Sequence, residues 1–104
     1  MKLLIYGAGV IGSLYAAAFA EAGYNTTVYA RGERLKALQT LGLQYEKNGN
    51  IHRANVTVIG TLENDDWYDF IFLTVKENQV HTALEELKYN ISPNIVTMVN
   101  TLER

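Results

Sequence analysis

Three glycines near the N-terminus follow the spacing G-x-G-x-x-G, which is typical of a turn that binds the pyrophosphate of a dinucleotide. Gly7 would permit the tight turn, Gly9 would let a pyrophosphate approach the backbone, and Gly12 would let a helix pack closely on a strand. The unpaired N–H groups and the positive dipole end of the following helix would attract the phosphates. We expect six residues to contact the dinucleotide: Gly7, Ala8, Gly9, Val10, Ile11 and Gly12.

The glycine motif alone is a weak signal, because three glycines in six residues also form strand-to-helix turns that bind no ligand. Its context strengthens the prediction. The motif follows the apolar run Leu3-Leu4-Ile5-Tyr6 and opens a segment with helical spacing, within a strand-helix-strand unit of about thirty residues. We therefore favour a dinucleotide site, to which the hydroxyl of Ser13 could also contribute.

The segment after the second predicted strand carries a basic residue at the position that contacts the adenosine ribose of a dinucleotide. This position distinguishes NAD(H) from NADP(H). Proteins that bind NAD or FAD in this way normally have an acidic residue there for the ribose hydroxyls. Here the residue is Arg31, whose planar guanidinium suits the 2′-phosphate of NADP(H) through paired, charge-assisted hydrogen bonds. Arg34 is a second candidate. Two alternatives stay open: both arginines are solvated residues of an amphipathic helix, or Glu33 turns toward the ribose.

Apolar periodicity divides the chain into alternating strands and helices. The run from Phe70 to Val75 does not alternate with polar residues, so we expect it to be buried on both faces, next to the first strand. The first predicted helix places five residues on one face, namely Ile11, Leu14, Tyr15, Ala18 and Ala22, and ends at a glycine cap, Gly23. Predicted strands cover residues 3–6, 26–30, 56–59, 70–75 and 95–99, and further helices end at Gly42 and before Ser92 and Pro93.

This order of elements predicts an α/β fold of the Rossmann type, a doubly wound parallel sheet that binds ligands beyond the carboxyl ends of its strands. The Asn48-Gly49 pair between residues 43–46 and 51–53 is typical of a tight turn and predicts a small antiparallel hairpin insertion near the edge. We expect residues 1–104 to form a single dinucleotide-binding domain.

Composition excludes several classes of function. The formal net charge of −2 gives no field that would gather a polyanion, so we expect no nucleic-acid partner. The chain has no cysteine, and His52 and His81 have no ligand partners at metal spacing, so we expect no metal site. Glycines and a glutamate interrupt the apolar N-terminal segment, so we expect neither a signal peptide nor a membrane span, and a cytoplasmic location.

Three segments together resemble the ketopantoate reductase family: the glycine motif with its Ala-rich helix, Ala30-Arg31-Gly32, and residues 75–79 (VKENQ). The resemblance covers the whole chain but only the N-terminal domain of that family. It implies an NADPH-dependent oxidoreductase that reduces 2-dehydropantoate, a small-molecule 2-oxo acid, in pantothenate biosynthesis. A homodimer is the assembly that we consider.

The resemblance also assigns site residues near the nicotinamide and the substrate. Lys76 and Gln79 match a Lys-x-x-Gln segment whose lysine lies in the cleft of the family's enzymes, and Asn100 matches an asparagine that contacts cofactor and substrate. Lys76 also follows the most buried strand, where sites of this fold are built, and its charge is unfavourable to the dipole of the helix that it precedes. Thr101 replaces the family's usual glycine, which would narrow the cleft for a different 2-oxo acid.

The family's helical C-terminal domain, which supplies the lysine thought to protonate the carbonyl oxygen, has no counterpart in these 104 residues. We therefore expect this chain alone to bind cofactor and to turn over ketopantoate negligibly. Two rival functions remain: a nucleotide-sensing Rossmann module, which would normally have an acidic residue in place of Arg31, and an NADP-dependent dehydrogenase of another hydroxy or amino acid.

Overall fold

The computed structural model describes residues 1–7 and 9–98 and contains a five-stranded parallel sheet in the order β5-β2-β1-β6-β7. This arrangement confirms the predicted α/β fold. A separate two-stranded antiparallel sheet is formed by β3 and β4. The elements are β1 (Lys2–Tyr6), α1 (Val10–Glu21), β2 (Asn25–Tyr29), α2 (Gly32–Leu41), β3 (Gln44–Lys47), β4 (Asn50–Arg53), β5 (Thr57–Ile59), β6 (Phe70–Leu73), the 3₁₀ turn η1 (Glu77–Gln79), α3 (Val80–Glu86) and β7 (Ile95–Thr97).

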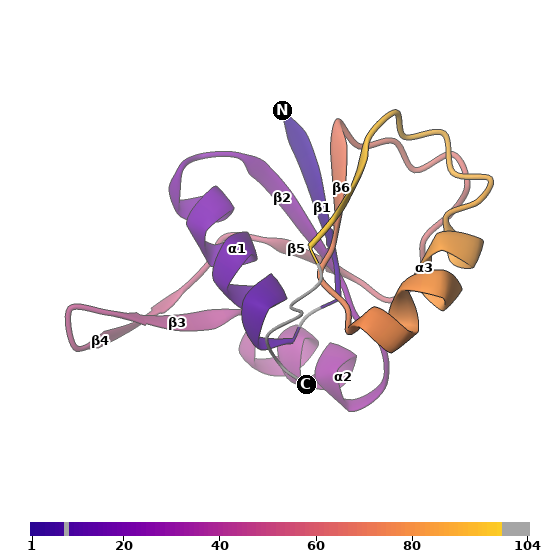
Figure 1. Cartoon of the computed structure of the whole chain (residues 1–104). Helices are drawn as coiled ribbons and strands as arrows, with labels where there is room; N and C mark the ends of the chain where they lie inside the picture. The colour runs from indigo at the N-terminus through magenta and orange to yellow at the C-terminus, as the bar shows by residue number, and fades with distance from the viewer. Residues whose placement is uncertain (8, 99–104) are drawn as a thin grey trace.

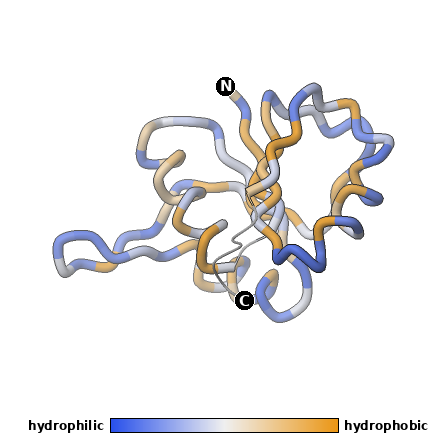
Figure 2. The backbone as a smooth tube through the Cα atoms, in the orientation of Figure 1, coloured by the Kyte–Doolittle hydropathy of each residue, from blue (hydrophilic) through white to orange (hydrophobic). Residues whose placement is uncertain are grey.

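Helices cover both faces of the sheet, with α1 and α2 on one side and α3 on the other (Figure 1). Side chains of β1 alternate between the two cores: Ile5 packs toward α1 and α2, and Leu4 packs toward α3. Both side chains are fully buried, as expected for a central strand. Figure 2 shows that the strands at the centre of the sheet are hydrophobic, whereas the β3-β4 hairpin is mostly hydrophilic.

Strand β6 lies directly beside β1, in parallel register from the pair Leu3 and Phe70 to the pair Tyr6 and Leu73. The prediction that the most apolar run neighbours the first strand is therefore confirmed. On its other side β1 pairs with β2, so the chain progresses in opposite directions on the two sides of β1. Ligands of doubly wound sheets bind at such a reversal point, beyond the carboxyl ends of the strands.

Helix α1 ends at the predicted glycine but buries a different face from the predicted one. Gly23 has a φ of +92°, and the N–H of Tyr24 donates to the carbonyl oxygen of Phe19 at 3.0 Å, which closes the helix in a Schellman motif. The buried positions of the helix are three small residues, Gly12, Ala16 and Ala17. Leu14, which belonged to the predicted stripe, is 62% exposed. The prediction was wrong because close approach of a helix to a sheet selects small side chains, whereas the stripe was chosen by hydrophobicity.

Two further boundaries test the predictions. The hairpin turn is confirmed, with φ of +55° at Asn48 and +77° at Gly49. Helix α3 stops at Glu86, earlier than predicted, because the side chains of Asn90 and Ser92 bind the loop before β6. Asn90 Nδ2 donates to the carbonyl oxygen of Asp66 at 2.9 Å, and Ser92 Oγ accepts from the N–H of Tyr68 at 2.9 Å.

Within residues 1–7 and 9–98, no helix has the length and apolar character needed to span a bilayer.

Candidate functional site

The glycine turn joins β1 to α1, and its shape depends on contacts with the end of β6. Gly7 has a φ of +110°, a conformation that L side chains rarely adopt. The hydroxyl of Thr74, directly after β6, donates to the carbonyl oxygen of Gly7 at 2.6 Å. A Cβ at Gly12 would lie 2.0 Å from that same carbonyl oxygen, so only glycine fits there. Sequence reasoning did not single out Thr74; its signal was a hydroxyl directly after the most apolar run of the chain.

Gly9 is the N-cap of α1 and faces open space. A Cβ built on it would meet nothing within 4 Å, in contrast to one built on Gly12. The N–H of Ser13 donates to the carbonyl oxygen of Gly9 at 2.9 Å, which starts the helix. The first N–H groups of a helix have no acceptor within the helix and attract anions. The turn thus combines a tightly packed base with an open rim that would admit a phosphate. Ala8 lies outside the described residues.

A cavity of about 640 Å³ lies at the carboxyl ends of β1, β2 and β6. Its volume is in the range of small-molecule sites. We call it the Arg31 cavity. It brings together residues that the sequence had predicted from separate segments, and its lining includes Gly7, Gly9, Arg31, Arg34, Lys76 and Gln79. The predicted residues Asn100 and Thr101 lie outside the described residues, so their position relative to this cavity stays a prediction.

Arg31, the N-cap of α2, lines the Arg31 cavity and makes an ion pair with Glu86, the last residue of α3. Its Nη1 lies 2.8 Å from Glu86 Oε1, and its guanidinium carbon lies 5.8 Å from the centre of the Tyr29 ring. The Arg31 side chain is 59% exposed and that of Glu86 31% exposed. The guanidinium is therefore both accessible from the cavity and held in place at the end of β2.

Two buried tyrosines hold the other oxygen of Glu86. Tyr6 and Tyr29, the paired last residues of β1 and β2, are only 3% and 7% exposed, with ring centres 4.8 Å apart. The hydroxyl of Tyr6 donates to Glu86 Oε2, and that of Tyr29 lies 3.5 Å from the same atom. Burial first, and then the neighbouring carboxylate of Glu86, raises the pKa of both tyrosines, so both stay neutral donors. Sequence reasoning missed this cluster.

Lys76 and Gln79 bracket the turn that leads from β6 into α3. Gln79 Oε1 accepts from the N–H of Lys76 at 3.3 Å, and the N–H of Gln79 donates to the carbonyl oxygen of Lys76 at 2.8 Å. These reciprocal bonds fix the turn in the manner of a capping box. Lys76 is exposed and lines the Arg31 cavity with the glycine turn. The structure thus gives Gln79 a positioning task and leaves the predicted role of Lys76 open.

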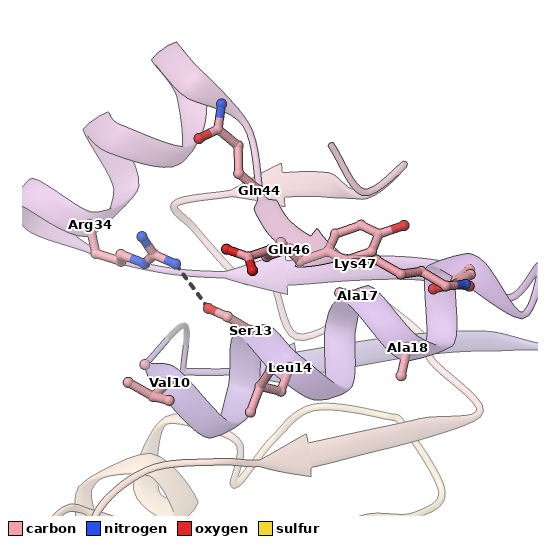
Figure 3. A pocket seen from close by; sticks show the side chains of 12 residues that line it. Val10, Ser13, Leu14, Ala17, Ala18, Arg34, Gln44, Glu46 and Lys47 are labelled. Atoms are coloured by element: carbon pink, nitrogen blue, oxygen red, sulfur yellow. Dashed lines mark hydrogen bonds and ion pairs between the residues drawn. The ribbon is translucent and has the colours of Figure 1, made fainter. Parts of the chain in front are cut away.

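Arg34 is directed toward α1. Its Nη2 donates to Ser13 Oγ at 2.9 Å, so the side chain bridges the first turns of α2 and α1 (Figure 3). Arg34 and Gly9 also line a second hollow of about 780 Å³, which we call the hairpin groove. Figure 3 shows Val10, Leu14 and Ala18 of α1 on one side of it and Gln44, Glu46 and Lys47 of the hairpin on the other.

Metal chemistry has no support in the described part of the chain, where no three histidine, cysteine, aspartate or glutamate residues gather closely enough to hold an ion. His52 is exposed on β4 and its ring stacks on that of Tyr45, with centres 5.5 Å apart. The hairpin histidine is therefore part of a cross-strand aromatic pair.

Comparison with known proteins relates the whole chain to one family of enzymes. The sequence model of the family "Ketopantoate reductase PanE/ApbA" matches residues 3–104. The 2-dehydropantoate 2-reductase of Mesorhizobium japonicum is 33% identical over 103 residues, which cover 96% of this chain and 32% of the relative. That of Bacillus subtilis is 29% identical over 100 residues, which cover 96% of this chain and 33% of the relative. The chain thus spans about a third of the length of these relatives.

Solved structures show the same relationship. The ternary complex of D-mandelate dehydrogenase with NADH and anilino(oxo)acetate aligns with a TM-score of 0.86 and 25% identity, over 96% of this chain and 34% of that one. A PanE/ApbA family ketopantoate reductase from Ralstonia eutropha aligns with a TM-score of 0.77 and 23% identity, over 93% of this chain and 33% of that one, and shows the shared fold. The family match over residues 3–104, supported by these alignments, shows that the chain belongs to the ketopantoate reductase family.

Proposed function

We propose that this chain binds NADP(H) in the Arg31 cavity, as the dinucleotide-binding part of a reductase that transfers hydride from NADPH to a 2-oxo acid. The observation that carries the proposal is the meeting of the open glycine turn and the Arg31 guanidinium at one cavity, beyond the carboxyl ends of β1 and β2. The space over Gly9 fits a pyrophosphate, and an arginine at the end of β2 fits a ribose 2′-phosphate.

Calorimetric titration of NADPH and NADH into the wild type and Arg31→Ala tests this proposal. A charge-assisted hydrogen bond contributes about 1.5–3 kcal/mol, so the variant should bind NADPH roughly ten- to hundredfold more weakly, with little change for NADH. Lys36→Ala is a matched control, because Lys36 is an exposed cation of α2 that does not line the cavity. An unchanged ratio of the two affinities in Arg31→Ala would contradict the assignment of Arg31.

We assign the substrate side of the site to Lys76 and Asn100, with 2-dehydropantoate as the substrate and pantothenate biosynthesis, in the cytoplasm, as the process. Support comes from the family and from the place of Lys76 at the cavity rim, next to the end of β6. NADPH would supply the hydride, while Lys76 would hold the polar end of the substrate and Gln79 would keep the backbone of Lys76 in place.

We also propose that residues 1–104 act as one dinucleotide-binding domain that needs a second domain for catalysis. The chain spans about a third of the length of its relatives, whereas hydride transfer requires a closed site with a proton donor. The purified chain should therefore bind NADPH and oxidise it negligibly in the presence of 2-dehydropantoate. Robust turnover, followed by absorbance at the nicotinamide band, would overturn this part of the proposal.

A dehydrogenase of another 2-hydroxy acid is the second candidate. It is favoured by the structural likeness to D-mandelate dehydrogenase, whose complex contains NADH, a dinucleotide without a 2′-phosphate. The same titrations separate the two candidates, because a wild type that binds NADH more tightly than NADPH would favour the second one. Membership of a reductase family makes a pure nucleotide sensor the weaker interpretation.

A further inference from the structure

Glu86 occupies an unusual place for an acidic residue, since it faces the guanidinium that the proposed function assigns to a phosphate. It is the last residue of α3, the helix whose Thr82 and Ala83 line the Arg31 cavity, and it contacts three residues of that lining, Tyr6, Tyr29 and Arg31. One of its oxygens lies 2.8 Å from Arg31 Nη1, and the other accepts from the hydroxyl of Tyr6. The carboxylate is therefore fixed by donors on both oxygens.

Glu86 and Arg31 form a pair of opposite charges, with Oε1 and Nη1 2.8 Å apart. The positive charge of Arg31 is thus largely balanced within the protein. A 2′-phosphate bound by Arg31 would lie within a few ångströms of Glu86 and would be repelled by it. Because the Glu86 side chain is only 31% exposed, solvent screens this repulsion only in part. Nucleotides without that phosphate would not meet this repulsion.

We propose that Glu86 is a specificity-determining residue that weakens the preference of this chain for a 2′-phosphate by neutralising Arg31. The proposal rests on the proposed function, because it presupposes that nucleotides bind in the Arg31 cavity. It predicts that the chain discriminates less between NADPH and NADH than it would if Arg31 had no ion pair with Glu86. Tyr6 and Tyr29 act as positioning residues, since their hydroxyls keep the carboxylate facing Arg31.

The test compares two small probes that differ only by the phosphate in question, adenosine 2′,5′-bisphosphate and adenosine 5′-monophosphate, titrated into the 104-residue chain. Glu86→Gln keeps the size of the side chain and an oxygen acceptor but removes the charge. It should bind the bisphosphate about three- to tenfold more tightly, the range expected for one partly screened charge, and leave the affinity for the monophosphate unchanged. Glu86→Ala should change the bisphosphate affinity in the same direction.

Glu85→Gln is the matched control, because Glu85 is the exposed neighbour on the same helix, whereas the ion pair with Arg31 and the hydrogen bond from Tyr6 are made by Glu86. It removes the same net charge and should leave both affinities as in the wild type. In an Arg31→Ala background the gain from Glu86→Gln should be smaller, because the part that acts through the guanidinium is lost and only the direct repulsion of the phosphate by Glu86 is relieved. A purely structural role of Glu86 would not produce this dependence on the probe and on Arg31.

Weaker bisphosphate binding by Glu86→Gln would overturn the inference and show that Glu86 orients Arg31 for the phosphate. An equal gain for both probes would overturn it too, as a general charge effect. If Arg31→Ala loses bisphosphate affinity while Glu86→Gln gains none, the inference fails and the proposed function stands. If neither substitution changes the ratio of the two affinities, both fail.

Discussion

The two hollows that share Gly9 and Arg34 differ in size and in what surrounds them. The hairpin groove is the larger, at about 780 Å³ against 640 Å³ for the Arg31 cavity. Its α1 wall consists of exposed side chains such as Val10 and Leu14, and the ion pair between Lys47 and Glu21 that closes one end is open to solvent. In the Arg31 cavity, buried tyrosines anchor the polar groups, and the glycine turn is bonded to β6.

This difference teaches that pre-organised polar groups, and not volume, mark the candidate site. Groups held by buried partners can meet a ligand without being reordered, which lowers the entropic cost of binding. Exposed apolar side chains of the hairpin groove, such as Leu14, would lose rotamer freedom on binding a ligand, at about 0.5–1.5 kcal/mol each. Substitutions in the two regions should therefore have unequal effects, and three of them test this contrast.

The largest effect is expected from Gly12→Ala, which disrupts the close contact of α1 with Gly7 and Thr74 beneath the glycine turn. Alanine inside a helix is favoured over glycine by about 1 kcal/mol. Here that gain is outweighed, because the new Cβ would lie 2.0 Å from the carbonyl oxygen of Gly7 and 2.5 Å from the hydroxyl oxygen of Thr74. We expect a net loss of about 2–4 kcal/mol in the free energy of unfolding, measured by urea denaturation.

Gly9→Ala is the control for this prediction. Its φ of −74° suits any residue, and the new Cβ would meet nothing within 4 Å. We expect its unfolding free energy to stay within about 0.5 kcal/mol of the wild type, while NADPH affinity falls because the methyl group occupies the approach to the backbone. Equal stability of the two variants would show that the close contact at Gly12 is not a constraint of the fold.

A smaller effect is expected from Tyr6→Phe, which touches only the Arg31 cavity. The variant loses the hydroxyl that donates to Glu86, and the carboxylate can recover part of that bond from solvent. We expect a loss of about 1 kcal/mol in the free energy of unfolding. Tyr24→Phe is the matched control, because Tyr24 is 43% exposed and should leave stability unchanged. Equal losses in the two variants would show that the hydrogen bond between Tyr6 and Glu86 does not stabilise the fold.

The pH dependence of stability sharpens the same prediction. Burial, and then Glu86, raises the pKa of Tyr6 above its ordinary value near 10, so the folded state keeps a proton that the unfolded state releases. The stabilising contribution is complete below about pH 10 and is lost as the pH rises toward the folded pKa. The unfolding free energy of the wild type should therefore fall more steeply above pH 10 than that of Tyr6→Phe. Parallel curves would show that Tyr6 titrates normally.

The sequence predicted those parts of the molecule that depend on local pattern. The order of strands and helices, the place of the apolar run that begins at Phe70 beside β1, and the turn at Asn48 follow from periodicity and from residue types that favour a given backbone conformation. The glycine turn was predicted for the same reason, because its tasks fall on consecutive residues. The roles of Lys76 and Asn100 stay predictions.

The tyrosine cluster could not be predicted, because Tyr6 and Glu86 are 80 residues apart and neither type is unusual for its element. Their meeting depends on how α3 lies across the ends of β1 and β2, which hydrophobic periodicity does not specify. The early end of α3 was missed for a related reason, since Asn90 and Ser92 bind a distant loop. Long-range polar contacts therefore decide both the boundary and the candidate site.

The smallest effect is expected from Leu14→Gln, in the hairpin groove. Leu14 is 62% exposed, so replacing it removes little apolar burial, and glutamine is also a good helix former. We expect the free energy of unfolding to change by less than about 0.5 kcal/mol and NADPH affinity to stay as in the wild type. Ala16→Leu, on the buried face of α1, is the contrasting variant and should lose about 1–3 kcal/mol through overpacking. A weakened NADPH affinity in Leu14→Gln, with stability intact, would mean that the nucleotide extends past Gly9 into the hairpin groove. The two hollows would then be parts of one binding site.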